Sequence, residues 1–525
     1  DVCTRYRLLW THSPSTKRAF SGAVVAPSDT SVPGRGPRDG GGGDKSASVR
    51  GDPRLVALMA RAQLLAEPDL GAWGLSNPAW ALAVLEYSDR PWLDSLASAS
   101  IPTISQYNPV QLTSTAWSYA VLGVSHTPLL DSLAESAISK IAAFAPEELS
   151  GTAWAFAPLS CSHRPLLTAI SAASRPKIAQ RFTPRALAAT AWACATLAWT
   201  DRPLLAAIAS AARPHLVQFK PQDIWNSAWA FAALCWSDDP LLYAISAAAI
   251  PHMGANAFGA QGLANTAWSF STLAVRDAPL LHSIAAASIA RISDFSLQAV
   301  ANTAWAFATL WFRHEPMLTS LAAAASGTRP WRSQEVANTA WSFAMLQFLD
   351  TPCMASLSAA SLKKLFPTDG FTAQQVANMA WAFATLAVHD GPLLNALASA
   401  AIRTIAADPN GSMRALASTP WALTRLRHHQ TAHTLLRGSG ARGGAAAEAL
   451  GPLLSECEQE PAHAGERALL ARLVDGSLRS VASGALLARA LEHGRAEAVA
   501  QEFQEVGDGL VHDCLVEQVK CALRE

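Results

Sequence analysis

The sequence carries little charge and no excess of either sign. Only 15% of its 525 residues are charged, below the roughly 25% of ordinary soluble chains, and 40 Lys and Arg balance 40 Asp and Glu. The basic excess that would indicate nucleic-acid binding through net charge is therefore absent. No window approaches 18 uninterrupted apolar residues, so we expect no membrane span, while the 50% apolar content excludes wholesale disorder.

The chain also lacks the motifs of metal sites and of common enzymes. Its eight Cys include no CxxC pair, which argues against a zinc framework or a disulfide scaffold and favours free thiols in a reducing compartment. We find no GxGxxG after a strand, no GxxxxGK(S/T), no HExxH and no GxSxG. We therefore expect no enzymatic activity, no catalytic residues, no cofactor and no metal.

Tryptophan is present in excess, with 18 Trp against five Tyr, and most of it is one repeated residue. Aligning segments such as ANTAWAFATL and ANTAWSFAML shows tandem units of 36–40 residues, which is the signature of a repeat architecture. The repeated tryptophans are Trp80, Trp117, Trp154, Trp192, Trp229, Trp268, Trp305, Trp341, Trp381 and Trp421.

A proline lies 11 residues after each of the first nine of these tryptophans, so length varies only between that proline and the next tryptophan. Each unit reads as two helices: helix A carries the Trp, and helix B begins near the Pro. Two residues before the Pro there is Asp in six units, as at Asp201, and His at His126, His163 and His314. We interpret these residues as caps of helix B rather than as metal ligands.

Helix A is apolar on most sides, which indicates burial between neighbouring copies, and no strand-like alternation interrupts the array. We therefore expect an all-α fold, a right-handed-type α-solenoid of about ten two-helix repeats over residues 66–430. Helix A would stack on its copies and line the inner surface, with helix B outside. Residues 1–65 read as a disordered, targeting-like segment, and residues 431–525 as a flexible hinge followed by an acidic helical tail.

One strip of helix A is polar, at seven and three residues before the Trp and four after it, positions called here −7, −3 and +4. These positions fall within about 40° of one another on a helical wheel, beside the Trp. The candidate contacts at −7 are Gln222, Gln261, Gln298, Gln334, Gln374, Arg185 and Arg414. Those at −3 are Asn77, Ser114, Asn226, Asn265, Asn302, Asn338, Asn378 and Ser418.

This stripe has two interpretations. Amides can pair with base edges and aromatic faces can stack on bases, so the stripe could hold single-stranded RNA at about one nucleotide per repeat. Alternatively, the Asn and Thr side chains form a structural ladder that bonds the next repeat's backbone, and each Trp fills the core between repeats. Basic residues recur before helix A, among them Lys177, Arg291 and Arg329; they could meet phosphates along one edge or simply lie on a solvated edge.

The repeat, with its core of the form (L/V)ANTAWAFATL, resembles the octotricopeptide and heptatricopeptide repeats of organellar RNA-binding proteins. It is also similar to the repeats of FAST-kinase-like and RAP-domain proteins, although no RAP domain is visible after the array. The resemblance implies sequence-selective binding of an mRNA or rRNA in a mitochondrion or chloroplast, supporting transcript processing, stability or translation. The acidic composition of the tail argues against RNA binding there, and we expect the tail to cap the solenoid or to contact another protein, with no membrane partner.

Two other functions remain open at this point. The neutral charge and Ala-rich helices would equally suit a protein-interaction scaffold built on an α-solenoid. A weaker possibility is an RNA-processing enzyme whose catalytic domain lies outside this sequence.

Overall fold

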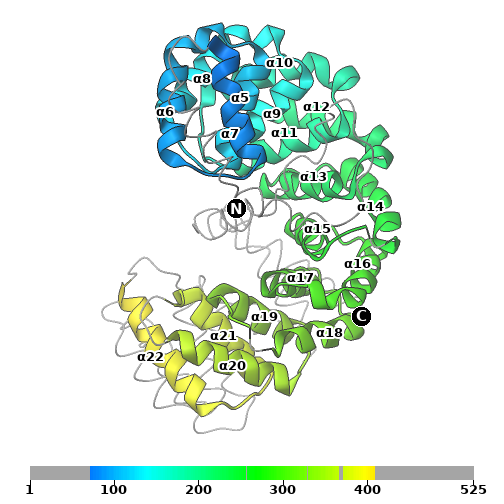
Figure 1. Cartoon of the computed structure of the whole chain (residues 1–525). Helices are drawn as coiled ribbons and strands as arrows, with labels where there is room; N and C mark the ends of the chain where they lie inside the picture. The colour runs from blue at the N-terminus through cyan, green and yellow to red at the C-terminus, as the bar shows by residue number, and fades with distance from the viewer. Residues whose placement is uncertain (1–70, 256, 328, 366–369, 408–525) are drawn as a thin grey trace, which may run out of the picture. The chain divides into compact units, whose positions relative to one another are not determined.

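The computed structural model describes residues 71–407, apart from residues 256, 328 and 366–369. These residues form 18 α-helices joined by turns and four short 3₁₀ helices, with no strand among them (Figure 1). The chain divides between Ala257 and Phe258 into two compact units, which are described separately. The expected all-α class is confirmed.

The first unit contains five helix A–helix B pairs in chain order. The A helices are α5 (Gly71–Val84), α7 (Pro109–Val121), α9 (Pro146–Phe156), α11 (Pro184–Thr196) and α13 (Pro221–Ala233). The B helices are α6 (Arg90–Ser100), α8 (Thr127–Lys140), α10 (Arg164–Arg181), α12 (Arg202–Ala212) and α14 (Asp239–Gly254). Three of its connections contain the 3₁₀ helices η2 (Ile101–Gln106), η3 (Ile141–Ala143) and η4 (Arg213–Gln218).

The second unit contains four more pairs. Its A helices are α15 (Ala260–Thr272), α17 (Leu297–Thr309), α19 (Ser333–Met345) and α21 (Ala373–Thr385). Its B helices are α16 (Ala278–Ala290), α18 (Glu315–Ala325), α20 (Thr351–Leu365) and α22 (Gly391–Ala407), with η5 (Ile292–Asp294) between α16 and α17.

Within each unit, every helix A packs along the helix A of the next repeat, and these contacts are more extensive than those between B helices. This stacking of helix pairs confirms the expected α-solenoid architecture. The described residues contain nine repeats. The tenth, around Trp421, lies outside them, as do the expected N-terminal segment and the expected hinge and acidic tail.

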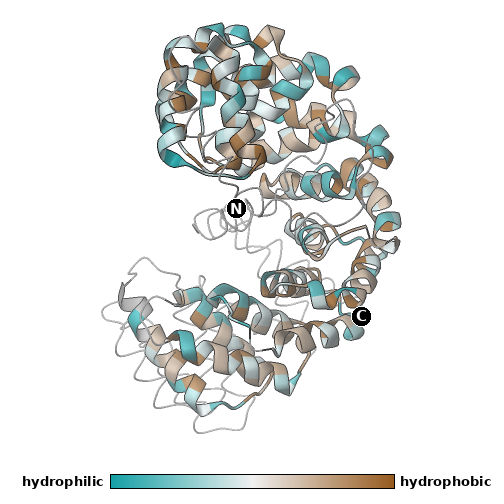
Figure 2. Cartoon of the chain, in the orientation of Figure 1, coloured by the Kyte–Doolittle hydropathy of each residue, from teal (hydrophilic) through white to brown (hydrophobic). Residues whose placement is uncertain are grey.

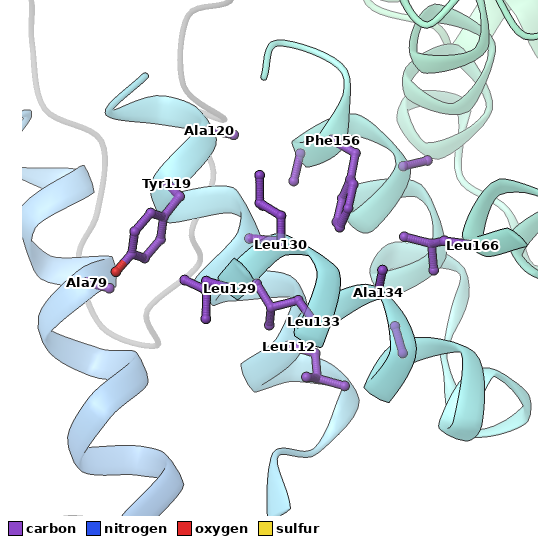
Figure 3. Close-up of a cluster of buried hydrophobic side chains, with 14 of the residues drawn as sticks. Ala79, Leu112, Tyr119, Ala120, Leu129, Leu130, Leu133, Ala134, Phe156 and Leu166 are labelled. Atoms are coloured by element: carbon purple, nitrogen blue, oxygen red, sulfur yellow. The ribbon is translucent and has the colours of Figure 1, made fainter. Parts of the chain in front are cut away.

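In seven of the nine described repeats, the residue two positions after the repeated Trp is a buried Phe or Tyr of the core, and it is replaced by Leu82 and Cys194 in the other two. In the first unit, Tyr119 of α7 and Phe156 of α9 flank Leu129, Leu130 and Leu133 of α8 (Figure 3). All five are at most 2% exposed, and the Tyr119 hydroxyl donates a hydrogen bond to the Leu93 carbonyl at 2.6 Å. The equivalent residues Phe231, Phe270, Phe307, Phe343 and Phe383 are equally buried.

A second aromatic position, which the sequence analysis does not predict, lies ten residues before the Trp and recurs in eight consecutive repeats. It immediately precedes the N-cap of helix A, and a buried Leu, Ile or Val follows five positions later, which is the spacing of a hydrophobic staple. Seven of the eight aromatics are buried, and Phe182 is half-buried. The residues are Tyr107, Phe144, Phe182, Phe219, Phe258, Phe295, Trp331 and Phe371.

Every described helix A ends in the same turn. In α15, the Val275 N–H donates to the Phe270 carbonyl at 2.8 Å and the Ala274 N–H donates to the Ser271 carbonyl at 3.1 Å, a Schellman motif. The residue six after the Trp has a positive φ of 51–66° in all nine repeats, although only one of the nine is glycine. These residues are Glu86, Gly123, Ser160, Ala198, Cys235, Ala274, Trp311, Gln347 and Ala387.

Helix B begins in the same way in all nine repeats. The Asp or His nine residues after the Trp accepts a hydrogen bond from the backbone N–H three residues on, as Asp201 does from Leu204 at 2.9 Å. His126, His163 and His314 accept this bond at their Nδ1 atoms, which confirms their interpretation as caps. Among the described residues, no group of three His, Cys, Asp or Glu could hold a metal ion.

The fixed C-cap and the fixed N-cap together explain why the Trp-to-Pro spacing never changes. An insertion between them would break either the Schellman bonds or the cap of helix B. The aromatic at ten before the Trp is also fixed in spacing, so all variation in repeat length falls between the Pro and that aromatic, in the end of helix B and the connection after it.

The helices carry hydrophilic and hydrophobic residues together, with hydrophilic residues present at many helix ends and turns (Figure 2). None of the described helices has both the length and the apolar character needed to cross a membrane. The described residues include four cysteines that are not joined in disulfides, Cys161, Cys194, Cys235 and Cys353.

Candidate functional site

The polar stripe coincides with the least buried face of helix A. Positions +1 and +3 are buried in nearly every repeat, whereas positions −7, −3 and +4 and the Trp itself are mostly half-buried or exposed. The structure therefore brings the sequence-predicted side chains to the accessible face of each helix. Because A helices stack within each unit, their stripes lie beside one another.

The residues at −7 are the most accessible of the predicted contacts. Gln222, Gln261 and Arg185 are exposed, and Gln298, Gln334 and Gln374 are half-buried. Each occupies the second residue of its helix, and none of the five Gln side chains is hydrogen-bonded to another described residue. Their amides are thus available for a ligand. Arg414 lies outside the described residues.

The residues at −3 differ among repeats in exposure. Asn77 is exposed, and Ser114, Asn226, Asn338 and Asn378 are half-buried. Asn265 and Asn302 are buried, at 4% and 6% exposed. Ser418 lies outside the described residues.

The Asn ladder of the alternative interpretation does not occur in the described repeats. None of the five Asn side chains from Asn226 to Asn378 forms a hydrogen bond to a neighbouring helix, and the Nδ2 of Asn265 is buried without a partner. An unpaired buried amide costs about 1–3 kcal/mol, so the Asn265 side chain is not explained by hydrogen bonds within the protein.

The Thr residues at +4 divide into two kinds. The hydroxyls of Thr196 and Thr309 donate to the carbonyl of the Trp in their own helix, at 2.9 and 3.0 Å. Those of Thr272 and Thr385 are buried without a partner. Two of the four Thr hydroxyls at position +4 are therefore hydrogen-bonded within their own helix.

The repeated tryptophans lie at the margin of the core rather than at its centre. Trp192 and Trp268 are buried, at 6% and 8% exposed, and the other seven described are half-buried. In the first unit they contact one another: Trp192 stacks on Trp154 with ring centroids 6.2 Å apart and lies 6.5 Å from Trp229. These indoles pack between repeats, and their outer edges border the stripe.

Several of the basic residues before helix A have a structural role. Lys177 donates to the Phe144 carbonyl at 2.6 Å, Arg291 to the Phe258 carbonyl at 3.0 Å and Arg329 to the Phe295 carbonyl at 2.7 Å. Each therefore ties the end of helix B to the connection that enters helix A of the same repeat. Lys140 makes the equivalent bond to the Tyr107 carbonyl, whereas Arg403 donates to the Leu365 carbonyl at the end of α20.

The acidic residues near the stripe are mostly engaged or buried. Glu148 and Glu335 accept hydrogen bonds from the backbone N–H groups of Ala145 and Arg332, at 2.7 and 2.8 Å. Asp223 is 9% exposed, and burial raises its carboxyl pKa above the ordinary value. Burial likewise raises the pKa of Glu335. Of the four acidic residues on the described A helices, only Glu147, at position −7 of α9, is exposed.

Comparison with known proteins gives one family similarity. A family model described as RNA-editing substrate-binding complex 6 protein matches residues 56–278, which include all helices from α5 to α15. The match thus covers the first repeats and less than half of the chain. No curated protein matches the sequence.

Proposed function

We propose that the chain binds single-stranded RNA through the stripe on its A helices and so supports processing, stability or translation of organellar transcripts. The observation that carries the proposal is the row of accessible, unbonded Gln side chains on successive repeats, beside half-buried indoles. The similarity to a family named for an RNA-editing substrate-binding complex supports it.

The chemistry of this face suits bases better than it suits a charged ligand. An amide offers both a donor and an acceptor, which allows bidentate pairing with a base edge. The A helices of the second unit carry only one charged residue, Glu335, and its carboxylate already caps its own helix. We infer that the chain acts by binding and not by catalysis.

The direct test is binding of purified full-length protein to a random single-stranded RNA pool, followed by selection and sequencing of the bound fraction. The proposal expects an enriched motif of up to about ten nucleotides, one per repeat. A pool that emerges unchanged, together with no retention of RNA on the protein, would refute it.

Two sets of variants separate contact from structure. Replacing Gln261, Gln298 and Gln334 with Ala should weaken RNA binding without lowering the melting temperature, because these side chains make no internal bonds. Replacing Asn265, Asn302 and Asn338 with Ala tests position −3. Unchanged RNA affinity with a lower melting temperature would show that these Asn residues are structural.

A protein-binding role is the second candidate, and it is favoured by one feature of the first two repeats. There, position −7 is apolar and exposed: Trp73 is 60% and Val110 is 53% exposed, with Val84 at 51% on the same helix face as Trp73. An apolar patch of this kind suits a protein partner. Capture of a specific protein that survives RNase treatment and is lost in Val110→Asp would support this role.

A further inference from the structure

The charges of this neutral protein are segregated to opposite edges of its helix pairs. Helices A and B of one repeat run antiparallel, so the end of helix B and the start of the next helix A share one edge, called here the connection edge. It extends from 20 residues after one repeated Trp to six residues before the next. The opposite edge, the A–B turn edge, spans 5 to 14 residues after each Trp.

The segregation holds in each unit separately. In the first unit the connection edge has seven Lys and Arg against three Asp and Glu, while the turn edge has three against seven. Among the described residues of the second unit, the connection edge has six basic and two acidic residues, and the turn edge has two and four. The zero net charge of the chain therefore conceals a basic edge, with a charge of +4 in the first unit and of +4 among the described residues of the second, which do not include Asp369 of the same connection.

On the turn edge, most charged side chains already interact within the protein. On the turn edge, Asp residues cap helix B, and two of the five Arg residues are already paired, Arg90 with Asp94 at 4.0 Å and Arg313 with Glu315 at 2.8 Å. A third, Arg202, lies over the ring of Trp236 at 5.7 Å. The accessible surface of that edge thus has no surplus of positive charge.

On the connection edge, the basic residues outnumber the acids that could neutralise them. Arg175, Arg181, Arg185 and Arg213 are all exposed, and none forms an ion pair with another described residue. The nearby Asp223 is buried, and it interacts electrostatically with Arg185 but with none of the other three Arg residues. These four guanidinium groups come from the end of α10, the start of α11 and the connection after α12, which are neighbouring elements of one unit.

We propose that the sugar–phosphate backbone of the bound RNA runs along the connection edge, with its phosphates against Arg175, Arg181, Arg185 and Arg213. This inference rests on the proposed function and specifies which end of each helix A faces the phosphates. Guanidinium groups pair bidentately with phosphate oxygens, and a series of them along successive repeats provides a track for a polyanion.

This placement determines which stripe positions read bases. Position −7 lies at the connection edge itself, and −3 is about 6 Å farther along the helix axis, whereas +4 is about 16 Å away, next to the acidic turn edge. Bases attached to phosphates at the connection edge therefore contact the Gln and Asn positions. The Thr residues at +4 lie outside the track, in agreement with the bonds that Thr196 and Thr309 make to their own helices.

One repeat has a carboxylate at position −7, and this residue provides a sensitive probe. Glu147 occupies position −7 of α9, is exposed, and forms no ion pair with another described residue. A carboxylate beside the track repels phosphates, so Glu147→Gln should raise RNA affinity by about two- to fivefold at low salt, and less as salt screens the repulsion.

The test compares two double variants of the full chain with equal charge change. The first, Arg181→Gln with Arg213→Gln, removes two charges of the connection edge. The second, Arg164→Gln with Arg276→Gln, removes two exposed charges of the turn edge and serves as the matched control. Affinity for a 20-nucleotide single-stranded RNA is measured by fluorescence anisotropy across a salt series, and folding is checked by circular dichroism and thermal melting.

The connection-edge variant should lose at least tenfold in affinity and reduce the slope of log K against log salt by about 1.4, since each phosphate contact contributes about 0.7 for a single strand. The control should stay within twofold of the unchanged protein. Equal losses in both variants, or no loss in either, would overturn the inference while leaving RNA binding itself intact. Failure of the unchanged protein to bind any RNA would instead refute the proposed function.

Discussion

The turn that ends each helix A permits a stabilising substitution to glycine. Ala274 adopts φ 56°, in the left-handed region, and is exposed, so its methyl group is strained by the backbone and is not packed in the core. Left-handed backbone costs a residue with a Cβ roughly 1–2 kcal/mol, and glycine does not have this cost. We therefore expect Ala274→Gly to stabilise the second unit.

The magnitude follows from two opposing terms. Relief of the left-handed strain favours the folded variant by about 1–2 kcal/mol, and the greater freedom of glycine in the unfolded chain disfavours it by about 0.4–1 kcal/mol. The net expectation is a stabilisation of about 0.5–1 kcal/mol. With a urea m-value of roughly 2 kcal/mol/M, the denaturation midpoint should rise by about 0.3–0.5 M.

The matched control is Ala286→Gly in the middle of α16, another exposed alanine of the same unit, which has ordinary helical backbone. There glycine costs about 1 kcal/mol, so the midpoint should fall by about 0.5 M. Urea unfolding of both variants is followed by far-ultraviolet circular dichroism. If Ala274→Gly lowers the midpoint as Ala286→Gly does, the left-handed turn is not a source of strain and the reasoning is refuted.

Three further predictions concern caps, thiols and a buried acid. Asp277→Ala should lower the urea midpoint by an amount equivalent to about 1 kcal/mol, because the Asp277 carboxylate caps α16. Asp277→Asn should retain most of the stability, and equal losses in the two variants would contradict the cap. Iodoacetamide should label the exposed Cys235 in the folded protein. Burial raises the thiol pKa of Cys194 and of Cys353 to about 12, so these two should react only in urea. Mass spectrometry reports the labelling of each site, and equal labelling of all three in the folded protein would contradict the burial of Cys194 and Cys353. Because burial raises the pKa of Asp223, its contribution to stability is complete below about pH 3.8 and is lost as pH rises through the folded-state pKa. Asp223→Asn should therefore raise the urea midpoint more at pH 7 than at pH 4, and an effect independent of pH would contradict this assignment.

Features that depend on short-range backbone geometry could be predicted from the sequence. The Trp-to-Pro spacing predicted a helix–turn–helix unit, and the Asp or His before the Pro was identified as a cap because capping is decided within three residues. The helix count of the nine described repeats follows from the same signals. The αL residue at the end of helix A was not predicted, because eight of the nine residues there are not glycine and only the hydrogen-bond pattern reveals the turn.

Features that depend on packing between repeats were harder to predict. The conspicuous Trp proved to be a marginal core residue, while the Phe or Tyr two positions later forms the centre of the core. The aromatic ten before the Trp could have been found by extending the alignment further from the Trp. Exposure at −3 also varies, from exposed Asn77 to buried Asn265, although both are the same amino acid in the same register. The exposure of a residue at −3 depends on how the neighbouring helices pack against it, so the sequence of one repeat alone does not determine it.

The distribution of charge follows from the same contacts that stabilise each repeat. Capping requires acidic or neutral acceptors at the start of helix B, so a repeat that caps helix B with Asp accumulates negative charge on the turn edge. Lys and Arg that tie helix B to the connection place positive charge on the opposite edge, as Lys177 and Arg329 do. Stacking such repeats produces a basic edge and an acidic edge even when the sum is zero. Local stability requirements of one repeat, multiplied along the array, are therefore sufficient to produce a surface that could guide a polyanion.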